Sequence, residues 1–466
     1  MKKIIYFVLA GLLLIPYSCQ KFLTIEPTDE ILTEDAINSV EDIQKTLVSC
    51  YDVLRNGNFF GGNMWTMSDL MADNTEKDFS DFGWDQISQR SMNLFNTVSR
   101  ETWANGYYSI ERSNYVLYLL DNSGVQDLTD AEKNRIEGEC RFIRAISHFE
   151  LVRFFALPYD ETKTNDQPGI PLRLEPILNI SIATTPIPRS SVETVYDTVI
   201  NELQKAAVLL PDDNNGYATS WAAKAYLAKV YFQMNNFDSA YFYADDIIEN
   251  GGFQLDSSVQ DRFSIANSQE AVFELQTTGS GSNSASTLIG NYRQNNPSNP
   301  GFYVATSLMI QALNDDNDTR QAFYNTRYIS GTSGNERTYC AKYDYDLMNV
   351  PVVHLTEILL IRAESAIDKS TPDLPSAIAD LQTIRNRAYG VGNKLVPSNS
   401  SATDLRTIAR FERRLELAFE GNRMHDLKRC KQSVRDLSWN SNRLVCQIPD
   451  IEQAGNPDIV LNPTGD

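Results

Sequence analysis

Apolar residues recur at three- and four-residue steps through several long segments of this 466-residue chain, and that periodicity restricts it to a largely helical fold. The segments are 33–54, 102–120, 136–155, 191–209 and 404–419. In the first of them, Thr33 precedes Glu34 and Asp35 as a helix N-cap does. We therefore predict a mainly α-helical protein in which the strands are few and short.

Two stretches show the spacing of the helix pairs found in tetratricopeptide repeats. The segment 227–240 has the large, small and aromatic order of such a pair, carried by Leu227, Ala228, Tyr231, Phe237 and Ala240. The segment 355–388 is a looser copy of the same pattern. A helix pair that cannot bury its apolar face alone must stack on neighbouring pairs, so the sequence predicts a curved helical scaffold.

The N-terminus has the form of a bacterial export signal, in which Lys2 and Lys3 precede an apolar run that ends just before Cys19. The run is shorter than the roughly 20 apolar residues of a membrane-spanning helix, so cleavage is expected. A cysteine directly after such a run resembles the lipobox of bacterial lipoproteins. We predict a signal peptide over 1–18, lipidation of Cys19 and a tether over 19–32. An ordinary secretory signal is the alternative.

The formal charge of −20 argues against binding of nucleic acid, or of an anionic lipid surface, through a basic face. The histidines His148, His354 and His425 lie in helical patterns, and the cysteines lack the spacing of a zinc site. We therefore predict no metal site and no cofactor. Most cysteines are expected to be buried thiols, and a disulfide between Cys430 and Cys446 stays open.

Three segments break the helical pattern and predict loop-rich insertions near 61–90, 158–188 and 277–350. The first is rich in Asp, Asn, Gly and Ser and predicts a loop around one short helix. The second is rich in proline and predicts a connector with little regular structure. Short β-prone pieces, at 271–275 and 337–343, flank the Gly-, Ser- and Asn-rich start of the third.

Motifs spread along nearly the whole mature chain resemble the SusD/RagB family of outer-membrane nutrient-binding lipoproteins. The motifs are Glu26-Pro27, Trp103 with Tyr107 and Asn114, Gly138 to Ala145, Ile187 to Ser191, Ala222 to Tyr231, Leu381 to Tyr389, and Ile408 to Leu427. The resemblance implies a scaffold of about four tetratricopeptide-like helix pairs. It also implies an irregular subdomain that supplies much of the ligand site, the whole spanning 33–466.

The same resemblance implies a surface-exposed lipoprotein, anchored in the outer membrane, that acts as a lid on a SusC-like TonB-dependent transporter. Most members of the family bind glycans and some serve peptide uptake, so we expect an oligo- or polysaccharide ligand, with a peptide as the alternative. Binding and handover break no bond, so we expect no enzyme activity. A tetratricopeptide scaffold that binds only protein partners and a surface hydrolase are the alternatives from other classes.

Recognition of a sugar in water needs flat apolar faces with polar groups beside them, and the irregular segments contain two such sets. Trp84 is flanked by Asp81 and Phe82 in a polar stretch with no helical apolar stripe. Tyr292 and Arg293 stand in the Gly-, Ser- and Asn-rich stretch. We predict these five residues as ligand-binding candidates, the alternative being loop anchors packed on the scaffold.

Other prominent residues have structural explanations. Trp65 and Trp103 fall at helical spacing and are expected in the core. Three glutamates fall four residues apart on one predicted helix face, and we expect ion pairs with nearby arginines rather than a catalytic or metal-binding ladder. The glutamates are Glu412, Glu416 and Glu420, and the arginines are Arg413, Arg414 and Arg423. The segment 314–318 lacks the glycine and glutamate of a calcium loop and predicts an acidic turn.

Overall fold

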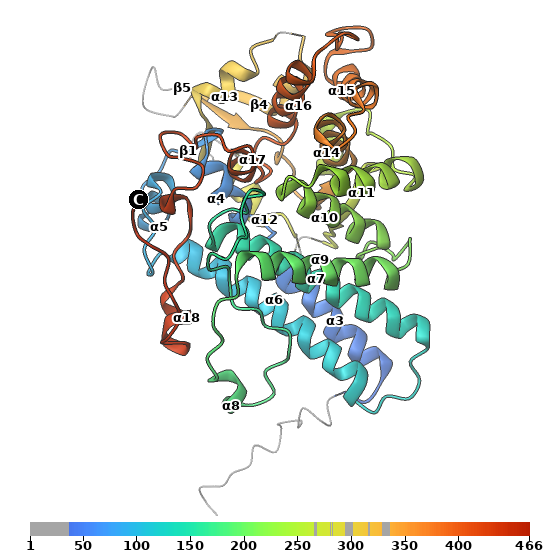
Figure 1. Cartoon of the computed structure of the whole chain (residues 1–466), viewed down its shortest axis with the longest axis vertical. Helices are drawn as coiled ribbons and strands as arrows, with labels where there is room; N and C mark the ends of the chain where they lie inside the picture. Colours follow the sequence, from blue (N-terminus) through green and yellow to red (C-terminus); the bar gives the residue numbers. More distant parts are fainter. Residues whose placement is uncertain are drawn as a thin grey trace, which may run out of the picture.

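The computed structural model describes residues 37–264, 268–279, 281, 283–293, 302–315, 317–328 and 336–466. Its long helices pack each on the next in chain order and wind into a stack (Figure 1). The helices are α3 (Val40–Leu54), α6 (Thr97–Asn122), α7 (Asp130–Phe155), α9 (Val192–Leu209), α10 (Ser220–Gln233), α11 (Phe237–Asn250), α14 (Leu355–Asp368), α15 (Leu374–Tyr389) and α16 (Ala402–Glu416). Taken two at a time, those from α3 to α15 make four helix pairs, which confirms the predicted scaffold.

The two stretches with tetratricopeptide spacing form the pairs α10 with α11 and α14 with α15. Helix starts follow from local capping chemistry. Thr129 caps α7 by accepting from the backbone N–H of Glu132, whose side chain reaches back to Thr129. The described part of the first predicted helix begins at Val40 with Ser39 as its cap, and the predicted cap Thr33 lies outside the described residues.

The irregular subdomain is built on an antiparallel sheet of four short strands in the order β1-β3-β5-β4. The strands are β1 (Thr75–Lys77), β3 (Tyr303–Ala305), β4 (Tyr324–Tyr328) and β5 (Glu336–Cys340). A second sheet joins β2 (Ala271–Leu275) to β6 (Val350–His354), directly before α14. The β-prone pieces thus form strands, although the second of them ends at Cys340 rather than at residue 343.

The segment 61–90 is more regular than the prediction of a loop around one short helix, which was wrong. It forms α4 (Asn63–Met71), β1 and α5 (Phe82–Gln89). The polar composition of the segment gave no sign of these elements. The strand β1 in particular gains its hydrogen bonds from β3, more than 220 residues away in the chain. A strand of three residues has no periodicity of its own to detect.

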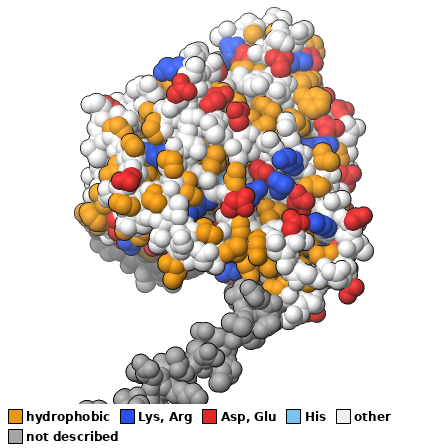
Figure 2. Space-filling model, turned by 60° about the horizontal axis from the view of Figure 1, so that its bottom comes forward, with side chains coloured by type: hydrophobic (Ala, Val, Ile, Leu, Met, Phe, Trp, Pro, Cys, Tyr) orange, Lys and Arg blue, Asp and Glu red, His pale blue; other side chains and the backbone are white. Residues whose placement is uncertain are grey.

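The remaining elements are short. The connector 158–188 contains only α8 (Ile180–Ala183), as its prolines predict. The segment around the third insertion adds η2 (Val259–Phe263), α12 (Ser286–Tyr292), α13 (Ser307–Ala312) and η4 (Thr319–Phe323), and the C-terminal part adds α17 (Arg423–Arg429), η5 (Asn442–Leu444) and α18 (Asp450–Gly455). On the face of the molecule shown in Figure 2, acidic and basic side chains are interspersed among hydrophobic ones.

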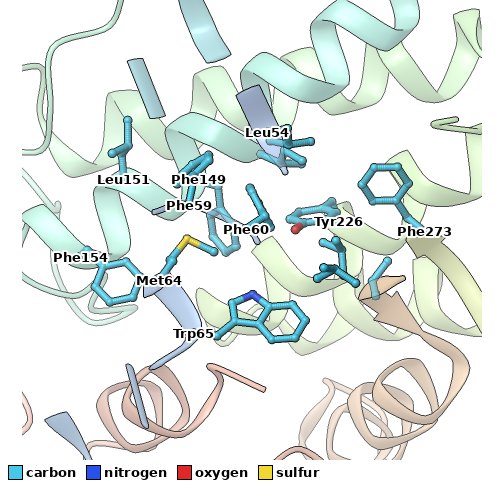
Figure 3. Close-up of a cluster of buried hydrophobic side chains, with 14 of the residues drawn as sticks. Leu54, Phe59, Phe60, Met64, Trp65, Phe149, Leu151, Phe154, Tyr226 and Phe273 are labelled. Atoms are coloured by element: carbon cyan, nitrogen blue, oxygen red, sulfur yellow. The ribbon is translucent and has the colours of Figure 1, made fainter. Parts of the chain in front are cut away.

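One large hydrophobic core joins the helical scaffold to the strand-bearing subdomain. Figure 3 shows its centre, where Phe59, Phe60 and Trp65 meet Phe149 of α7 and Tyr226 of α10. Trp65 and Trp103 are both buried, which confirms their predicted place in the core. Because a continuous core crosses the boundary, the scaffold and the subdomain form one packed body.

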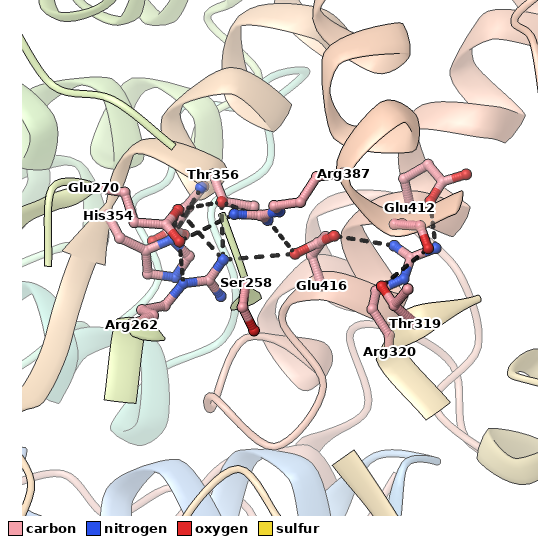
Figure 4. Close-up of polar contacts among 12 residues, drawn as sticks. Ser258, Arg262, Glu270, Thr319, Arg320, His354, Thr356, Arg387, Glu412 and Glu416 are labelled. Atoms are coloured by element: carbon pink, nitrogen blue, oxygen red, sulfur yellow. Dashed lines mark hydrogen bonds and ion pairs between the residues drawn. The ribbon is translucent and has the colours of Figure 1, made fainter. Parts of the chain in front are cut away.

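A buried chain of ion pairs crosses the same boundary (Figure 4). Arg262 of η2 pairs with Glu270 and Glu420 at 3.3 Å and with Glu416 at 3.5 Å, and all four side chains are buried. Arg387 of α15 joins Glu270 to Glu416, at 3.0 and 2.8 Å. The predicted structural role of the glutamates is confirmed by their burial and by their ion pairs.

The predicted partners of these glutamates were wrong. Glu412 pairs with Arg320 and Arg385, and Glu420 lies beyond the end of α16. The neighbouring arginines form ion pairs with other carboxylates. Arg413 pairs with Glu357 and Asp426. Arg414 and Arg423 both pair with Asp73. Residues one or two positions apart on a helix point in different directions, and Arg413, three residues before Glu416, is held instead by carboxylates of α14 and α17. Nearness in sequence therefore does not predict these pairs.

Acid is expected to weaken the fold through this network. Burial raises the pKa of Glu270, but Arg262 and Arg387 more than offset it, so that the pKa is about 2 against an ordinary 4.5. Lys229 and Arg413 do the same for Glu357. The stability that these carboxylates contribute is present above about pH 4.5 and is lost as the pH falls towards 2. The thermal unfolding midpoint should fall over this range, and a constant midpoint would contradict the assignment.

Cys430 and Cys446 are both free thiols, so the disulfide that the sequence left open does not form. The backbone of Cys446 is held on α7 by a hydrogen bond to the Phe154 carbonyl, whereas Cys430 ends α17. Among the described helices, none combines the length and the hydrophobicity that crossing a membrane requires.

Candidate functional site: an aromatic surface at the edge of the sheet

Pairing of β1 with β3 brings together two of the segments that the sequence marked as loop-rich. Thr75, Glu76 and Lys77 lie opposite Ala305, Val304 and Tyr303. The ladder continues past the strands, because the Asp78 N–H donates to the Phe302 carbonyl at 3.0 Å. Aromatic residues that directly follow β1 and directly precede β3 therefore lie side by side.

These residues form what we call the aromatic surface, made of Phe79, Phe82, Trp84, Phe302 and Tyr303. The Phe79 ring lies 5.2 Å from the Phe302 ring and 5.4 Å from the Tyr303 ring, and Trp84 meets Tyr303 edge-on at 5.3 Å, measured between ring centroids. Phe82, at the start of α5, is 72% exposed and Phe302 is 44% exposed, whereas Tyr303 is buried. Exposed rings on a packed aromatic base offer a rigid apolar platform to a ligand.

The start of α5 sets the directions of the candidate residues. Asp81 caps the helix by accepting from the Trp84 N–H at 3.0 Å, which fixes Trp84 over Tyr303 and leaves Phe82 pointing into solvent. Gly83 faces inward, where an added Cβ would lie 2.7 Å from Thr97 Oγ1. The absence of a side chain at this one position lets α5 lie against the start of α6.

Charged groups surround the rings. Lys77 pairs with Asp85 of α5, donates to the Phe79 carbonyl and lies 5.0 Å from the centre of the Phe79 ring. Asp78 lies 3.6 Å from Arg337 of β5. The exposed carboxylate of Asp81 stands at the start of α5 beside Phe82. The arrangement combines apolar faces with hydrogen-bonding groups, which suits recognition of a ligand that is both apolar and polar.

The structure buries Tyr292 behind this surface and engages Arg293 in ion pairs with two aspartates. Tyr292 is 0% exposed and lies behind the site, 5.6 Å from Tyr303 and 5.5 Å from Phe419. Arg293 is partly exposed and pairs with Asp344 at 3.1 Å and Asp346 at 2.7 Å. Tyr292 has no face open to a ligand, so it supports the aromatic surface from below and we leave both residues out of it.

Sequence reasoning missed Phe79, Phe302 and Tyr303 as part of the site. A usable signal was present, since Phe302 and Tyr303 directly follow the polar stretch and lead into a β-prone run. The burial of Tyr292 also had a signal, because Leu288 precedes it by four residues and the two line the inner face of α12. The predicted lipidation site, Cys19, lies outside the described residues.

Other prominent groups do not make a second site of this kind. His148, His354 and His425 are all buried. No group of three or more His, Cys, Asp or Glu side chains in the described part of the chain could hold a metal ion. Asp315 and Asp318 pair with Lys394 and Arg320, as expected of a structural acidic turn. The cavity beside His354 and Glu357 has a volume of about 20 Å³, which suits a water molecule and not a ligand.

Two family models match the chain. The model described as starch-binding, associating with the outer membrane, covers residues 21–232, and the model of the SusD family covers residues 196–455. Together the two models cover the helical scaffold, β1, α5 and the residues of the buried chain of ion pairs. The chain belongs to the SusD family, whose members are nutrient- and carbohydrate-binding proteins associated with the outer membrane.

Individual relatives agree with this assignment. One SusD-like protein of Formosa agariphila is 23% identical over 89% of this chain and 87% of its own length. A second is 25% identical over 87% of this chain and 86% of its own length. A SusD superfamily protein of Bacteroides thetaiotaomicron has the same fold, with a TM-score of 0.79, 24% identity, and coverage of 91% of this chain and 100% of that one. A protein of Bacteroides vulgatus described as a putative sugar binding protein has a TM-score of 0.78 at 23% identity, covering 92% and 99%.

Proposed function

We propose that this protein is a surface-exposed lipoprotein that binds an oligo- or polysaccharide on the aromatic surface and delivers it to a SusC-like TonB-dependent transporter. In this proposal Cys19 carries the lipid anchor in the outer membrane, and no chemical step takes place on the protein. The observation that carries the proposal is the cluster of the Phe79, Trp84, Phe302 and Tyr303 rings beside charged groups, with the exposed ring of Phe82 at the adjoining start of α5.

The physical basis is the dual character of a sugar ring. The C–H faces of the ring gain from covering exposed aromatic carbon, while its hydroxyls need donors and acceptors when they leave water. Phe82 and Phe302 supply the apolar area, and the exposed residues Asp78 and Asp81 supply polar groups. Since β1, β3 and α5 hold the rings before any ligand arrives, little conformational entropy is lost on binding.

Two other functions make different predictions for the same surface. A peptide-binding member of the family would use the exposed rings for apolar side chains and would respond to peptides rather than glycans. A tetratricopeptide scaffold for protein partners would bind through its helices and would not depend on Phe82. A screen of the full chain by calorimetry against plant, fungal and host glycans, with a peptide mixture alongside, separates the three.

Replacing Phe82 with alanine is expected to weaken binding of the glycan found in that screen by about tenfold. The ring is almost free of contacts with the core, so its loss should leave the thermal midpoint unchanged. Trp84→Ala should weaken binding at least as much, with some loss of stability, because Trp84 also packs on the core. Titration calorimetry on both variants measures the effect.

Phe242 provides the matched control. It is 65% exposed but lies on α11 of the scaffold, so Phe242→Ala removes a similar area of apolar surface at a different place. Glycan binding that is equally weakened by Phe82→Ala and Phe242→Ala would reflect non-specific adhesion. Unaltered binding in both Phe82→Ala and Trp84→Ala would exclude the aromatic surface as the site.

A further inference from the structure

A groove lined by arginines runs along the outer face of α16, a helix near one end of the molecule, and reaches the start of α17 (Figure 1). It has a volume of about 440 Å³, within the range of small-molecule sites. We call it the arginine groove, and its lining residues are Thr403, Arg406, Thr407, Arg410, Phe411, Arg414, Arg423 and Gln432. None of these residues belongs to the aromatic surface.

Every charged residue in this lining is an arginine. The carboxylates that pair with these arginines lie behind them, since none of the carboxylates lines the groove and each of their side chains is at most 16% exposed. An anion that enters the groove therefore meets guanidinium groups first. The pairs are Arg406 with Asp368, Arg410 with Glu364, and both Arg414 and Arg423 with Asp73.

The groups around the groove carry more positive than negative charge. One of the three carboxylates is shared by two arginines of the groove, and Glu364 also pairs with Arg429 of α17 at 2.9 Å. Five arginines are thus set against three carboxylates. Two further acidic residues nearby do not line the groove, because Asp404 caps the start of α16 and Asp426 pairs with the buried Arg413. This local excess opposes the formal charge of −20 on the whole chain.

Arg410 has donors that a ligand can reach. It holds Glu364 through its Nε atom alone, at 2.8 Å. Its two Nη atoms have no hydrogen-bond partner among the described residues, and neither atom is buried. The side chain of Arg410 is 30% exposed and that of Arg406 is 31% exposed. A guanidinium presents its N–H groups in one plane, where they match two oxygens of a carboxylate or a sulfate.

The rest of the lining suits a sugar ring better than a bare anion. Phe411 is 40% exposed on the same face of α16. Thr403, Thr407 and Gln432 are exposed beside it and offer hydroxyl and amide groups. The C–H face of a sugar ring gains from covering exposed aromatic carbon, and its hydroxyls need polar partners. The groove thus combines positive charge, one aromatic face and neutral hydrogen-bonding groups.

We propose that the arginine groove binds an acidic saccharide, with a carboxylate or sulfate group held by Arg406 and Arg410 and a sugar ring against Phe411. The inference rests on the proposed function for the choice of a saccharide, and it adds a ligand class and a second place of binding. Contact with the guanidinium groups favours the anion, while the acidic surface elsewhere on the chain repels it. The selectivity for charged saccharides therefore comes from this groove.

Titration calorimetry of the full chain tests this proposal with two acidic probes, tetragalacturonate and a heparin tetrasaccharide. The methyl ester of tetragalacturonate has the same backbone without the charge. At least one acidic probe should bind saturably and about tenfold or more tightly than the ester. Arg410→Gln should weaken that binding about tenfold and still fold, because Glu364 keeps Arg429. Arg406→Gln should act in the same direction and is the second variant if Arg410→Gln does not fold.

Arg141→Gln provides the matched control. Arg141 lies on α7, far from α16 in the chain, and shares the buried Glu202 with Arg144 as Arg410 shares Glu364 with Arg429. The substitution removes the same charge from the whole chain and should leave binding of the acidic probes unchanged. Equal weakening by Arg141→Gln and Arg410→Gln would reduce the effect to overall charge and overturn the proposal.

Other results would also overturn it. Silence with both acidic probes, or equal affinity for tetragalacturonate and its ester, would remove the role of the charge. Inorganic sulfate or a tetraglutamate peptide that binds as tightly as the saccharides would make the groove a general anion site. Unchanged binding in folded Arg410→Gln and Arg406→Gln would place the anion elsewhere. Phe82→Ala should leave binding of the acidic probes intact, so failure at the groove is distinguishable from failure at the aromatic surface.

Discussion

Replacing Arg262 with methionine is expected to lower the free energy of unfolding by about 3–5 kcal/mol. The guanidinium is fully buried and is shared by Glu270, which directly precedes β2, and by Glu416 and Glu420 at and just after the end of α16. Methionine retains much of the side-chain length but removes the positive charge of the guanidinium, which balances part of the negative charge of the three carboxylates. Arg387 and Lys342 remain, but each is already engaged with one or two of the same glutamates.

Urea unfolding followed by circular dichroism measures this change. Lys45→Met is the control, because it also removes one ion pair, that between Lys45 and Glu41, but on the exposed side of α3. An exposed pair contributes little, so this variant should unfold as the parent chain does. A loss below about 1 kcal/mol for Arg262→Met would show that the network reorganises around the missing charge, contrary to a central role for Arg262.

The helical scaffold was predictable because its signals are local. Apolar spacing within 102–120 and 136–155 identified α6 and α7, and the structure extends each by several residues at its start. Those extra turns are largely polar on the outside, so periodicity understates their length. The spacing around Tyr231 likewise identified α10 and α11, because the two helices of a pair are neighbours in sequence as well as in space.

The subdomain was harder to predict, because its structure depends on contacts between distant residues. No pattern near Glu416 indicates that Arg262 and Arg387 are its partners, and no pattern near Lys77 indicates that Tyr303 lies opposite. The candidate site was therefore half predicted. Trp84, Phe82 and Asp81 share one short helix start and were found together, whereas Phe302 joins them only through strand pairing.

Adding a single methyl group at Gly421 is expected to lower the free energy of unfolding by about 2–5 kcal/mol. Gly421 has φ of +76°, in the left-handed region that residues with a side chain disfavour. An added Cβ would also lie 2.8 Å from the Cα atom of Trp65, a backbone atom that cannot turn aside. The Gly421 N–H donates to the buried Asp69 carboxyl at 2.8 Å, so a backbone shift would strain that bond too.

Gly392→Ala separates the two causes. Gly392 has φ of +83°, but nothing lies within 4 Å of its added Cβ, so alanine there meets the conformational cost of about 1–2 kcal/mol and no clash. Urea unfolding of the two variants should differ by the cost of pressing a methyl group against Trp65. Equal losses of unfolding free energy in the two variants would mean that the backbone at Trp65 shifts to make room for the methyl group at little cost. A larger loss at Gly421 would show that the turn after α16 and the core around Trp65 fit together only where that position has no side chain.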